Sequence, residues 1–399
     1  MTDGYGRMTP SQWPASLLPH SPHPAPRLAR VSGEPPTPVT QPFMPPLAEY
    51  LPYLEVIWAN RWLTNSGPLH QQLEAALEAH LGVSHLSLVS NGTTALWLAL
   101  QALKIGGEVI TTPFSFVATA HALRLVGATP VFVDIDEHDC NLSPAAIEPA
   151  LTERTSAILP VHCFGHPCDV TAIGQVADIY DLKVIYDAAH AFGVQVVGQS
   201  VLSHGDLSTL SFHATKVFNT VEGGAIISPD ARTKARIDRL RNFGFVDDMT
   251  MASPSINGKL NEFQAGFGLL QLGYMDRILA RRAQISARYH AALGDVAGIV
   301  SFRMDDAVRP NHSYFPVLVT QDYPMDADAL CARLHAAGIM ARRYFHPLIC
   351  DMPGYRDLPS ARQPLPVARR IARQILCLPI HPNLSDDLVD RAIGILADV

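Results

Sequence analysis

The sequence predicts an α/β protein with a mainly parallel sheet that helices cover on both faces. Two observations indicate this class. Short apolar runs alternate with segments of helical periodicity, and 48% of the 399 residues are hydrophobic, which is enough for a large buried core. Ligands in such sheets bind at the carboxyl ends of the strands. Functional residues are therefore expected just after the apolar runs.

The N-terminal stretch, residues 1–46, is predicted to be a proline-rich flexible or extended arm. It holds 12 of the chain's 32 prolines and shows neither helical nor strand periodicity. From about Leu47 the pattern changes to that of a globular protein. We expect a large domain over residues 47–285 and a smaller C-terminal domain over residues 286–399.

Periodicity predicts the elements of the two domains in order. Helices are expected over residues 69–81 and 93–103, where apolar side chains recur at helical spacing. Six strands are expected at residues 108–112, 130–135, 157–161, 183–187, 207–212 and 224–228. Beyond residue 265 one long helical stretch runs toward Tyr289 and connects to the smaller domain. That domain is expected to contain a strand at 314–319, a helix over 328–337 and a terminal helix over 385–396.

The composition excludes several classes of protein. The formal net charge is −7, the pI is near 6.2, and lysine and arginine are scattered along the chain. This gives no electrostatic footprint for nucleic acid or an anionic membrane. No secretion signal is expected, because no charged head followed by an apolar core stands at the N-terminus, and no apolar run approaches the ~20 residues that span a bilayer. The six cysteines show no disulfide-framework spacing, so a cytoplasmic location is expected.

A cluster of histidines and cysteines raises zinc as an alternative. Cys163 and Cys168 lie five residues apart beside His162 and His166. No second ligand pair follows at zinc-site spacing, and the segment looks like a strand that ends in a turn. Small buried residues are the preferred interpretation, and no metal is predicted.

The most informative feature is Lys216, which stands among small and polar residues just after an apolar run, in Ser211-Phe-His-Ala-Thr-Lys216. A lysine there can form an imine with an aldehyde cofactor if burial or a nearby cation lowers its pKa from about 10.4. The alternative is an ordinary surface lysine. The hypothesis therefore depends on whether the rest of the chain supplies a cofactor site.

Three further motifs supply the parts of such a site. The segment Asn91-Gly-Thr-Thr-Ala95 starts a helix whose first amides can bind a phosphate, although ordinary capping also explains it. Asp187 ends a strand and can pair with a pyridinium nitrogen, or it can simply cap the next helix. Phe114 and Phe116 can stack on a flat ring or belong to the core. Together with Lys216 these parts predict pyridoxal 5'-phosphate (PLP) as the cofactor.

These residues resemble the DegT/DnrJ/EryC1/StrS family of PLP-dependent sugar aminotransferases over residues 45–399. The markers are residues 62–68, 91–96, 113–119, 160–167, 186–190, 211–216, 222–224 and 257–262. The resemblance implies the PLP-dependent transferase type I fold, which is aspartate aminotransferase-like. It consists of a large domain with a mainly parallel, seven-stranded type of sheet and a smaller C-terminal α+β domain. The resemblance says nothing of the proline-rich arm.

The resemblance also implies roles for individual residues. Lys216 would anchor the cofactor and carry the proton during transamination, and Asp187 would pair with the pyridine nitrogen. The remaining cofactor contacts would be Phe116 on the ring, His190 near the phenolic oxygen, and Thr93, Thr94 and Ser211 at the phosphate. Asn261 would complete the phosphate site of the neighbouring subunit, which implies an obligate homodimer with shared active sites. Thr64, Tyr344 and His346 are candidates for substrate contacts.

For the reaction, the resemblance implies amino transfer from glutamate to a ketone on a nucleotide-linked deoxysugar. Dehydratase members of the family carry histidine in place of the lysine, whereas this chain keeps Lys216. The sequence around His213 is more similar to members that act at sugar carbon 4 than to those that act at carbon 3. A dTDP-4-keto-6-deoxyglucose substrate is therefore expected, in the biosynthesis of lipopolysaccharide O-antigen or of a glycosylated natural product.

Three alternatives stay open at this point. The same fold and cofactor can act at carbon 3 or on another keto substrate. A non-catalytic regulatory or sugar-binding member of the family would keep the fold without the reaction. A free amino acid substrate would call for an arginine that grips its carboxylate, for which Arg241, Arg342 and Arg343 are candidates.

Overall fold

The main sheet has seven strands in the order β2-β10-β9-β6-β5-β3-β4. The computed structural model describes residues 36–247 and 249–398. β10 runs antiparallel to both of its neighbours, and the other adjacent strands pair in parallel. The strands are β2 Leu86–Val89, β3 Glu108–Thr111, β4 Thr129–Phe132, β5 Thr155–Leu159, β6 Lys183–Asp187, β9 Leu207–Ser211 and β10 Gly224–Ile227. The predicted α/β class and mainly parallel sheet are confirmed.

Helices cover both faces of this sheet because successive side chains along a strand point to opposite sides. Ile185 in the middle of β6 packs with residues of α3, α4 and α6. Its neighbours Val184 and Tyr186 pack with residues of α5 on the other face. The helices are α2 Pro68–Leu81, α3 Gly92–Ala102, α4 Ala118–Leu125, α5 Val170–Tyr180 and α6 Ala231–Leu240.

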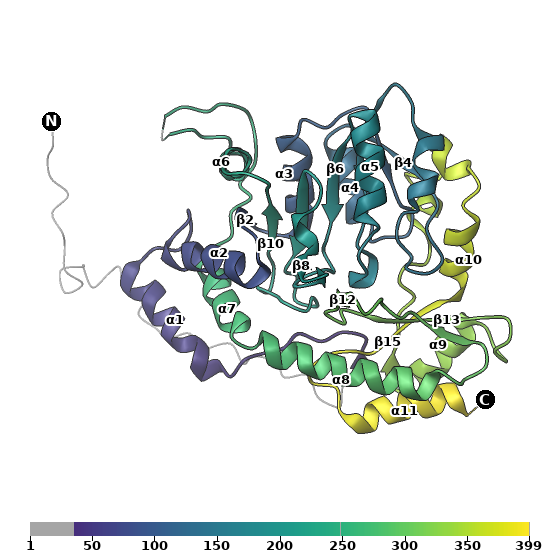
Figure 1. Cartoon of the computed structure of the whole chain (residues 1–399). Coiled ribbons are helices and arrows are strands. Elements are labelled where there is room, and N and C mark those ends of the chain that lie inside the picture. Colours follow the sequence, from purple (N-terminus) through teal and green to yellow (C-terminus); the bar gives the residue numbers. More distant parts are fainter. Residues whose placement is uncertain (1–35, 248, 399) are drawn as a thin grey trace, which may run out of the picture. The chain divides into compact units, whose positions relative to one another are not determined.

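The C-terminal part of the chain has its own antiparallel sheet, β11-β13-β15, beside which α8 (Met275–Leu293), α9 and α11 lie (Figure 1). A further small sheet has the order β12-β7-β8. The bounds are β7 Gln195–Val196, β8 Gln199–Ser200, β11 Ile299–Ser301, β12 Val308–Arg309, β13 Phe315–Val319, α9 Ala327–Ala336, α10 Pro366–Gln374, β15 Ile375–Leu378 and α11 Asp386–Ala397. The strand and two helices predicted here are confirmed.

The helical stretch beyond residue 265 differs from the prediction of one long helix. It consists of α7, Glu262–Leu272, and α8, Met275–Leu293, with a break at Gly273. Glycine is a weak helix former, so α7 ends before Gly273 although the helical spacing of apolar residues continues beyond it. α8 then crosses the predicted domain boundary at residue 285: Met275 packs in the core beneath the large sheet, and Tyr289 packs in the C-terminal core. The division at residue 285 stays a prediction.

The last residues of the predicted arm pack against the rest of the chain. β1, Thr37–Pro38, pairs in parallel with β14, Ile339–Met340. Val39 is buried and its carbonyl oxygen accepts a hydrogen bond from the Ile380 amide at 3.0 Å. The compact unit begins at Thr37, so residues 37–46 belong to it, and residues 1–35 lie outside the described part of the chain.

Several elements had no counterpart among the predicted ranges, and two of them lie ahead of α3. α1, Leu47–Asn60, follows the packed end of the arm, and β2 adds an edge strand to the sheet ahead of α3. None of the helices within residues 36–247 and 249–398 is long and apolar enough to cross a membrane.

Candidate active site

Asp187 lies at the carboxyl end of β6 and is only 5% exposed. Its Oδ2 accepts a hydrogen bond from the Thr119 hydroxyl at 2.8 Å, and its Oδ1 accepts one from the Ala189 amide at 3.1 Å. Burial raises the pKa of Asp187, whereas these two donors and the nearby Lys216 lower it. Neutral donors only partly offset the desolvation of a carboxylate, so this position suits a cationic N–H partner.

The hydroxyl that donates to Asp187 was not predicted from the sequence. Thr119 lies in the first turn of α4, which follows β3, and its Oγ1 is also 2.8 Å from Ser115 Oγ. Both hydroxyls are buried. The segment 113–119 could have predicted it, because a hydroxyl that follows a parallel strand lies at the same sheet edge as Asp187.

Lys216 lies in the loop between β9 and β10 and is partly buried. Burial lowers the pKa of Lys216 to about 8, although the charge of Asp187 opposes this shift. Each of the two side chains therefore senses the charge of the other. An amine with this pKa is neutral in roughly a tenth of the molecules at pH 7, far more than an ordinary lysine, and a covalent anchor reacts in that neutral form.

His190 is held by a backbone hydrogen bond that fixes its neutral tautomer. Its Nδ1 accepts from the Phe164 amide at 3.2 Å, so the ring carries its proton on Nε2. Burial, assisted by the charge of Lys216, lowers the pKa of His190 well below its usual range. The ring stacks on Phe345 at a centroid distance of 6.2 Å and meets Tyr314 edge-on at 4.9 Å. His190 is therefore a neutral Nε2–H donor.

The start of α3 closely approaches the end of β9. A Cβ atom on Gly92 would lie 2.7 Å from the Cβ of Ser211, so only glycine fits without a shift. The Asn91 Oδ1 accepts from the Thr94 amide at 2.8 Å, which leaves the earlier amides of Gly92 and Thr93 ahead of this cap. The Thr94 hydroxyl accepts from Ser90 Oγ at 3.2 Å. These first-turn amides and the Ser211 hydroxyl form a place for an anion.

Of the two candidate ring platforms, only one is available. Phe114 is buried in the core and contacts Phe164 and Phe345 edge-on. Phe116, two residues later, is 61% exposed. Phe116 is therefore the aromatic side chain that an added ring could cover.

The predicted substrate residues come from two separate segments. Tyr344 meets Tyr314 edge-on at 5.7 Å, and Tyr314 in turn contacts His190. His346, two residues after Tyr344, is exposed. Thr64 is exposed in the loop between α1 and α2, and no hydrogen bond links it to Lys216 or Asp187 among the described residues.

Asn261 is the N-cap of α7, where its Oδ1 accepts from the Gln264 amide at 3.0 Å. That bond uses the oxygen and leaves the amide nitrogen as a donor. No hydrogen bond within residues 36–247 and 249–398 joins Asn261 to Lys216.

Two of the three candidate carboxylate-binding arginines already form ion pairs within the chain. Arg241 is buried, and its guanidinium bonds Glu74 at 2.6 Å and Asp238 at 2.9 Å. Arg343 pairs with Asp328 and bonds backbone carbonyls. Arg342 is exposed beside Tyr344, and its charge lowers the pKa of that tyrosine against the stronger effect of burial.

The arrangement combines a buried carboxylate, an amine of lowered pKa, a neutral imidazole donor and an anion-binding helix start. The first three lie together, and the helix start touches the strand that leads to Lys216. A flat aromatic ring with a cationic nitrogen, a phenolic oxygen, an aldehyde and a phosphate matches these groups in charge and hydrogen bonding. The site therefore fits PLP chemically.

Comparison with known proteins gives a consistent result. The family model described as DegT/DnrJ/EryC1/StrS aminotransferase family matches residues 48–397. The chain is 50% identical over 361 residues to the dTDP-4-amino-4,6-dideoxy-D-glucose transaminase of Shigella dysenteriae, covering 90% of this chain and 98% of that protein. It is 32% identical over 334 residues to the dTDP-3-amino-3,4,6-trideoxy-alpha-D-glucose transaminase of Micromonospora megalomicea subsp. nigra, covering 82% of this chain and 89% of that protein. The structure of DesI, solved in the presence of its TDP-sugar product, superposes with a TM-score of 0.87 at 36% identity, covering 92% of this chain and 93% of DesI.

Proposed function

Since the chain belongs to the DegT/DnrJ/EryC1/StrS aminotransferase family, we propose that it aminates carbon 4 of dTDP-4-keto-6-deoxyglucose with glutamate as donor. Glutamate would leave as 2-oxoglutarate and the sugar ketone would become an amine. The observation that carries this proposal is Lys216 with its lowered pKa beside the buried Asp187. The family uses pyridoxal 5'-phosphate, whose protonated ring supplies an electron sink for the electron pair that stays on the donor's α carbon when its proton is removed.

In this proposal each group at the sheet edge binds one part of the cofactor. The carboxylate of Asp187 would accept a hydrogen bond from the protonated ring nitrogen, and the Nε2–H of His190 would donate to the phenolic oxygen. The phosphate would take the first amides of α3, at Thr93, together with the hydroxyls of Thr94 and Ser211. Phe116 would stack on the ring. The cationic partner at Asp187 would offset the burial that raises the pKa of that carboxyl.

Lys216 would have two functions, as covalent anchor and as proton carrier. Its Nζ, with a pKa of about 8, takes up and returns a proton near neutral pH with little driving force in either direction. That range suits a residue that must remove a proton and deliver it again in one turnover. The loop between β9 and β10 keeps the amine close enough to Asp187 for the two charges to interact.

Carbon 4 is preferred to carbon 3 because of the two relatives. The relative whose name places the amine at carbon 4 is 50% identical, and the relative whose name places it at carbon 3 is 32% identical. For the substrate we propose contacts with Thr64, Tyr344 and His346. Arg342 would take a glutamate carboxylate, since Arg241 and Arg343 are engaged elsewhere.

We further propose an obligate homodimer in which Asn261 binds the phosphate of the partner's cofactor. Support comes from a row of exposed apolar side chains on α1 and the loop after it, which is typical of a protein interface. The row consists of Leu47, Leu51, Val56, Trp58, Trp62 and Leu63. All six cysteines are free thiols, which supports the proposed cytoplasmic location. The destination of the product, O-antigen or a natural product, stays a prediction.

The test is amino transfer from glutamate to a panel of nucleotide-linked keto sugars. The panel holds the dTDP-, UDP- and GDP-linked 4-keto-6-deoxy sugars and a dTDP-linked 3-keto sugar, and the amine position is assigned by NMR. We expect turnover to be highest with dTDP-4-keto-6-deoxyglucose. Amination of the 3-keto sugar alone would favour carbon 3. A protein that binds PLP but aminates no sugar would favour a regulatory or sugar-binding role.

A further inference from the structure

The segment Asn257–Glu262, which carries Asn261, is fixed by hydrogen bonds at three of its residues, Gly258, Leu260 and Glu262. The Gly258 carbonyl accepts from the Ser90 amide, and the Gly258 amide donates to the Arg241 carbonyl, both at 2.8 Å. At the other end the Glu262 carboxylate accepts from the amides of Leu69 and His70, each at 2.9 Å. Between these ends the Leu260 carbonyl lies 3.3 Å from Nδ1 of His70. Asn261 therefore lies between two contacts that come from α2.

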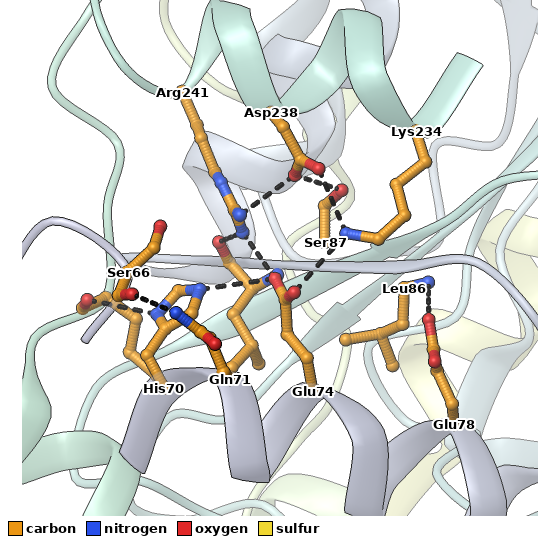
Figure 2. A network of polar contacts seen from close by, with 12 residues as sticks. Ser66, His70, Gln71, Glu74, Glu78, Leu86, Ser87, Lys234, Asp238 and Arg241 are labelled. Carbon is orange, nitrogen blue, oxygen red and sulfur yellow. Dashed lines mark hydrogen bonds and ion pairs between the residues drawn. The ribbon is translucent and has the colours of Figure 1, made fainter. Parts of the chain in front are cut away.

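His70 connects this segment to a partly buried ion network (Figure 2). Its ring is 1% exposed, with Nε2 3.2 Å from Oε1 of Glu74. Both neighbours of the ring, the Leu260 carbonyl and the Glu74 carboxylate, are acceptors. The ring therefore bonds both at once only when both of its nitrogens donate. His70 links the segment to a charged group that cannot move freely.

The network holds Glu74 from several sides (Figure 2). Arg241 donates to Oε1 at 2.6 Å, the Leu88 amide donates to the same oxygen at 3.0 Å, and Lys234 lies 3.3 Å from Oε2. Burial raises the pKa of Glu74, but His70, Arg241 and Lys234 together hold it well below its usual range. The carboxylate is therefore a fixed anion that connects α2, β2 and α6.

We propose that His70 is a positioning residue for Asn261 and so sets the cofactor affinity of the partner's active site rather than of its own. Its ring anchors the carbonyl of Leu260, the residue immediately before Asn261. The side chain of His70 touches neither Lys216 nor Asp187 among the contacts of the described residues. This inference rests on the proposed function, in which Asn261 crosses to the neighbouring subunit.

Mixed dimers test this proposal, because they separate an effect in the same subunit from an effect in the partner. In the trans arm, a wild-type subunit is paired with a His70→Ala, Lys216→Ala subunit. In the cis arm, a His70→Ala subunit is paired with a Lys216→Ala subunit. The visible absorbance of lysine-bound PLP reports only the subunit that keeps Lys216. Titration with PLP then gives the Kd of that one site.

We expect the PLP Kd to rise about tenfold in the trans arm, the factor of one weakened hydrogen bond to the phosphate. In the cis arm it should stay within about twofold of the wild-type/Lys216→Ala dimer. His70→Gln in the trans arm should recover most of the affinity, because its amide can still donate to the Leu260 carbonyl. An equal rise in both arms, a rise in the cis arm alone, or no rise in either would overturn the proposal.

Glu78→Gln is the matched control on the same helix. Glu78 Oε1 accepts from the Leu86 amide at 2.8 Å, so this change also weakens the contact of α2 with β2 (Figure 2). It does not touch Leu260, and the Kd in the trans arm should not change. Loss of the lysine-bound PLP band from wild-type dimers would contradict the proposed function itself. A normal band with equal arms would contradict only the role of His70.

Discussion

The starts of α2 and α3 differ in what binds their first amides. At α2 no side chain from the helix start provides a cap, and the carboxylate of Glu262 takes the amides of Leu69 and His70. At α3 the side-chain cap within the described residues is Asn91, which takes only the Thr94 amide. A helix start attracts an anion through its amides and dipole. The chain supplies that anion at α2 and leaves room for a ligand phosphate at α3.

Removal of the carboxylate at α2 should have the largest effect on stability. Glu262→Ala leaves two buried amides without an acceptor, at roughly 1–3 kcal/mol each. We expect the free energy of unfolding in urea to fall by about 3 kcal/mol. Glu262→Gln keeps one acceptor oxygen and should lose about half as much. Equal stability of Glu262→Ala and wild type would show that water replaces the carboxylate.

At α3 the corresponding change should affect the cofactor more than the fold. Gly92→Ala places a Cβ 2.7 Å from that of Ser211, which forces the helix start and the strand end apart. We expect the Kd for PLP, measured by absorbance titration, to rise about 10- to 100-fold, which corresponds to about 1.4–2.8 kcal/mol. Gly174→Ala is the control, because nothing lies within 4 Å of its added Cβ in the middle of α5. That variant should bind PLP normally.

Loss of the Ser211 hydroxyl is a smaller change at the same place. Ser211→Ala removes one donor to the proposed phosphate, so the PLP Kd should rise about tenfold. The hydroxyl of Ser208, on the same strand, hydrogen-bonds only to the His204 carbonyl, at 3.4 Å, among the described residues. Ser208→Ala should leave the Kd unchanged. Equal Kd values for the two variants would place the phosphate elsewhere.

The smallest effect concerns the pH dependence of the apo-protein. The pKa of Lys216 is about 8 in the fold and 10.5 at its ordinary value. Between these pH values the unfolded chain binds a proton that the folded chain has released, so stability rises with pH. Below about pH 8 Lys216 is charged in the folded protein, so the full cost of burying that charge lowers the free energy of unfolding. Lys216→Met should therefore be more stable than wild type at pH 7, and the difference should vanish near pH 10.5.

Thermal or urea unfolding of the two apo-proteins from pH 7 to pH 10.5 measures this difference. A constant difference across the range would mean that Lys216 keeps an ordinary pKa. The effect is modest because the side chain is only partly buried, and solvent screens part of the charge.

The sequence predicts the strand ends well because one local pattern determines them. The apolar run before Asp187 is a strand, and the short run before Lys216 is another, so both residues reach one sheet edge. β2 was not predicted, because its four buried residues show no apolar periodicity that would distinguish a strand from a helix. The long helix was wrong at Gly273, where local propensity overrides apolar spacing.

Contacts between distant segments could not be predicted in this way. The bond from Glu262 to α2 joins residues 193 positions apart, and no local pattern marks it. The hydroxyl of Thr119 reaches Asp187 only because β3 and β6 lie in one sheet with β5 between them. Such partners depend on strand order, which apolar spacing does not determine.

The central claim is that Lys216 holds PLP at the carboxyl end of the sheet. The visible absorbance spectrum after reconstitution with PLP, before and after addition of glutamate, tests it most directly. Wild type should show a band that glutamate bleaches, and Lys216→Ala should show no such band and no amino transfer. A band that persists in Lys216→Ala and still responds to glutamate would contradict the claim.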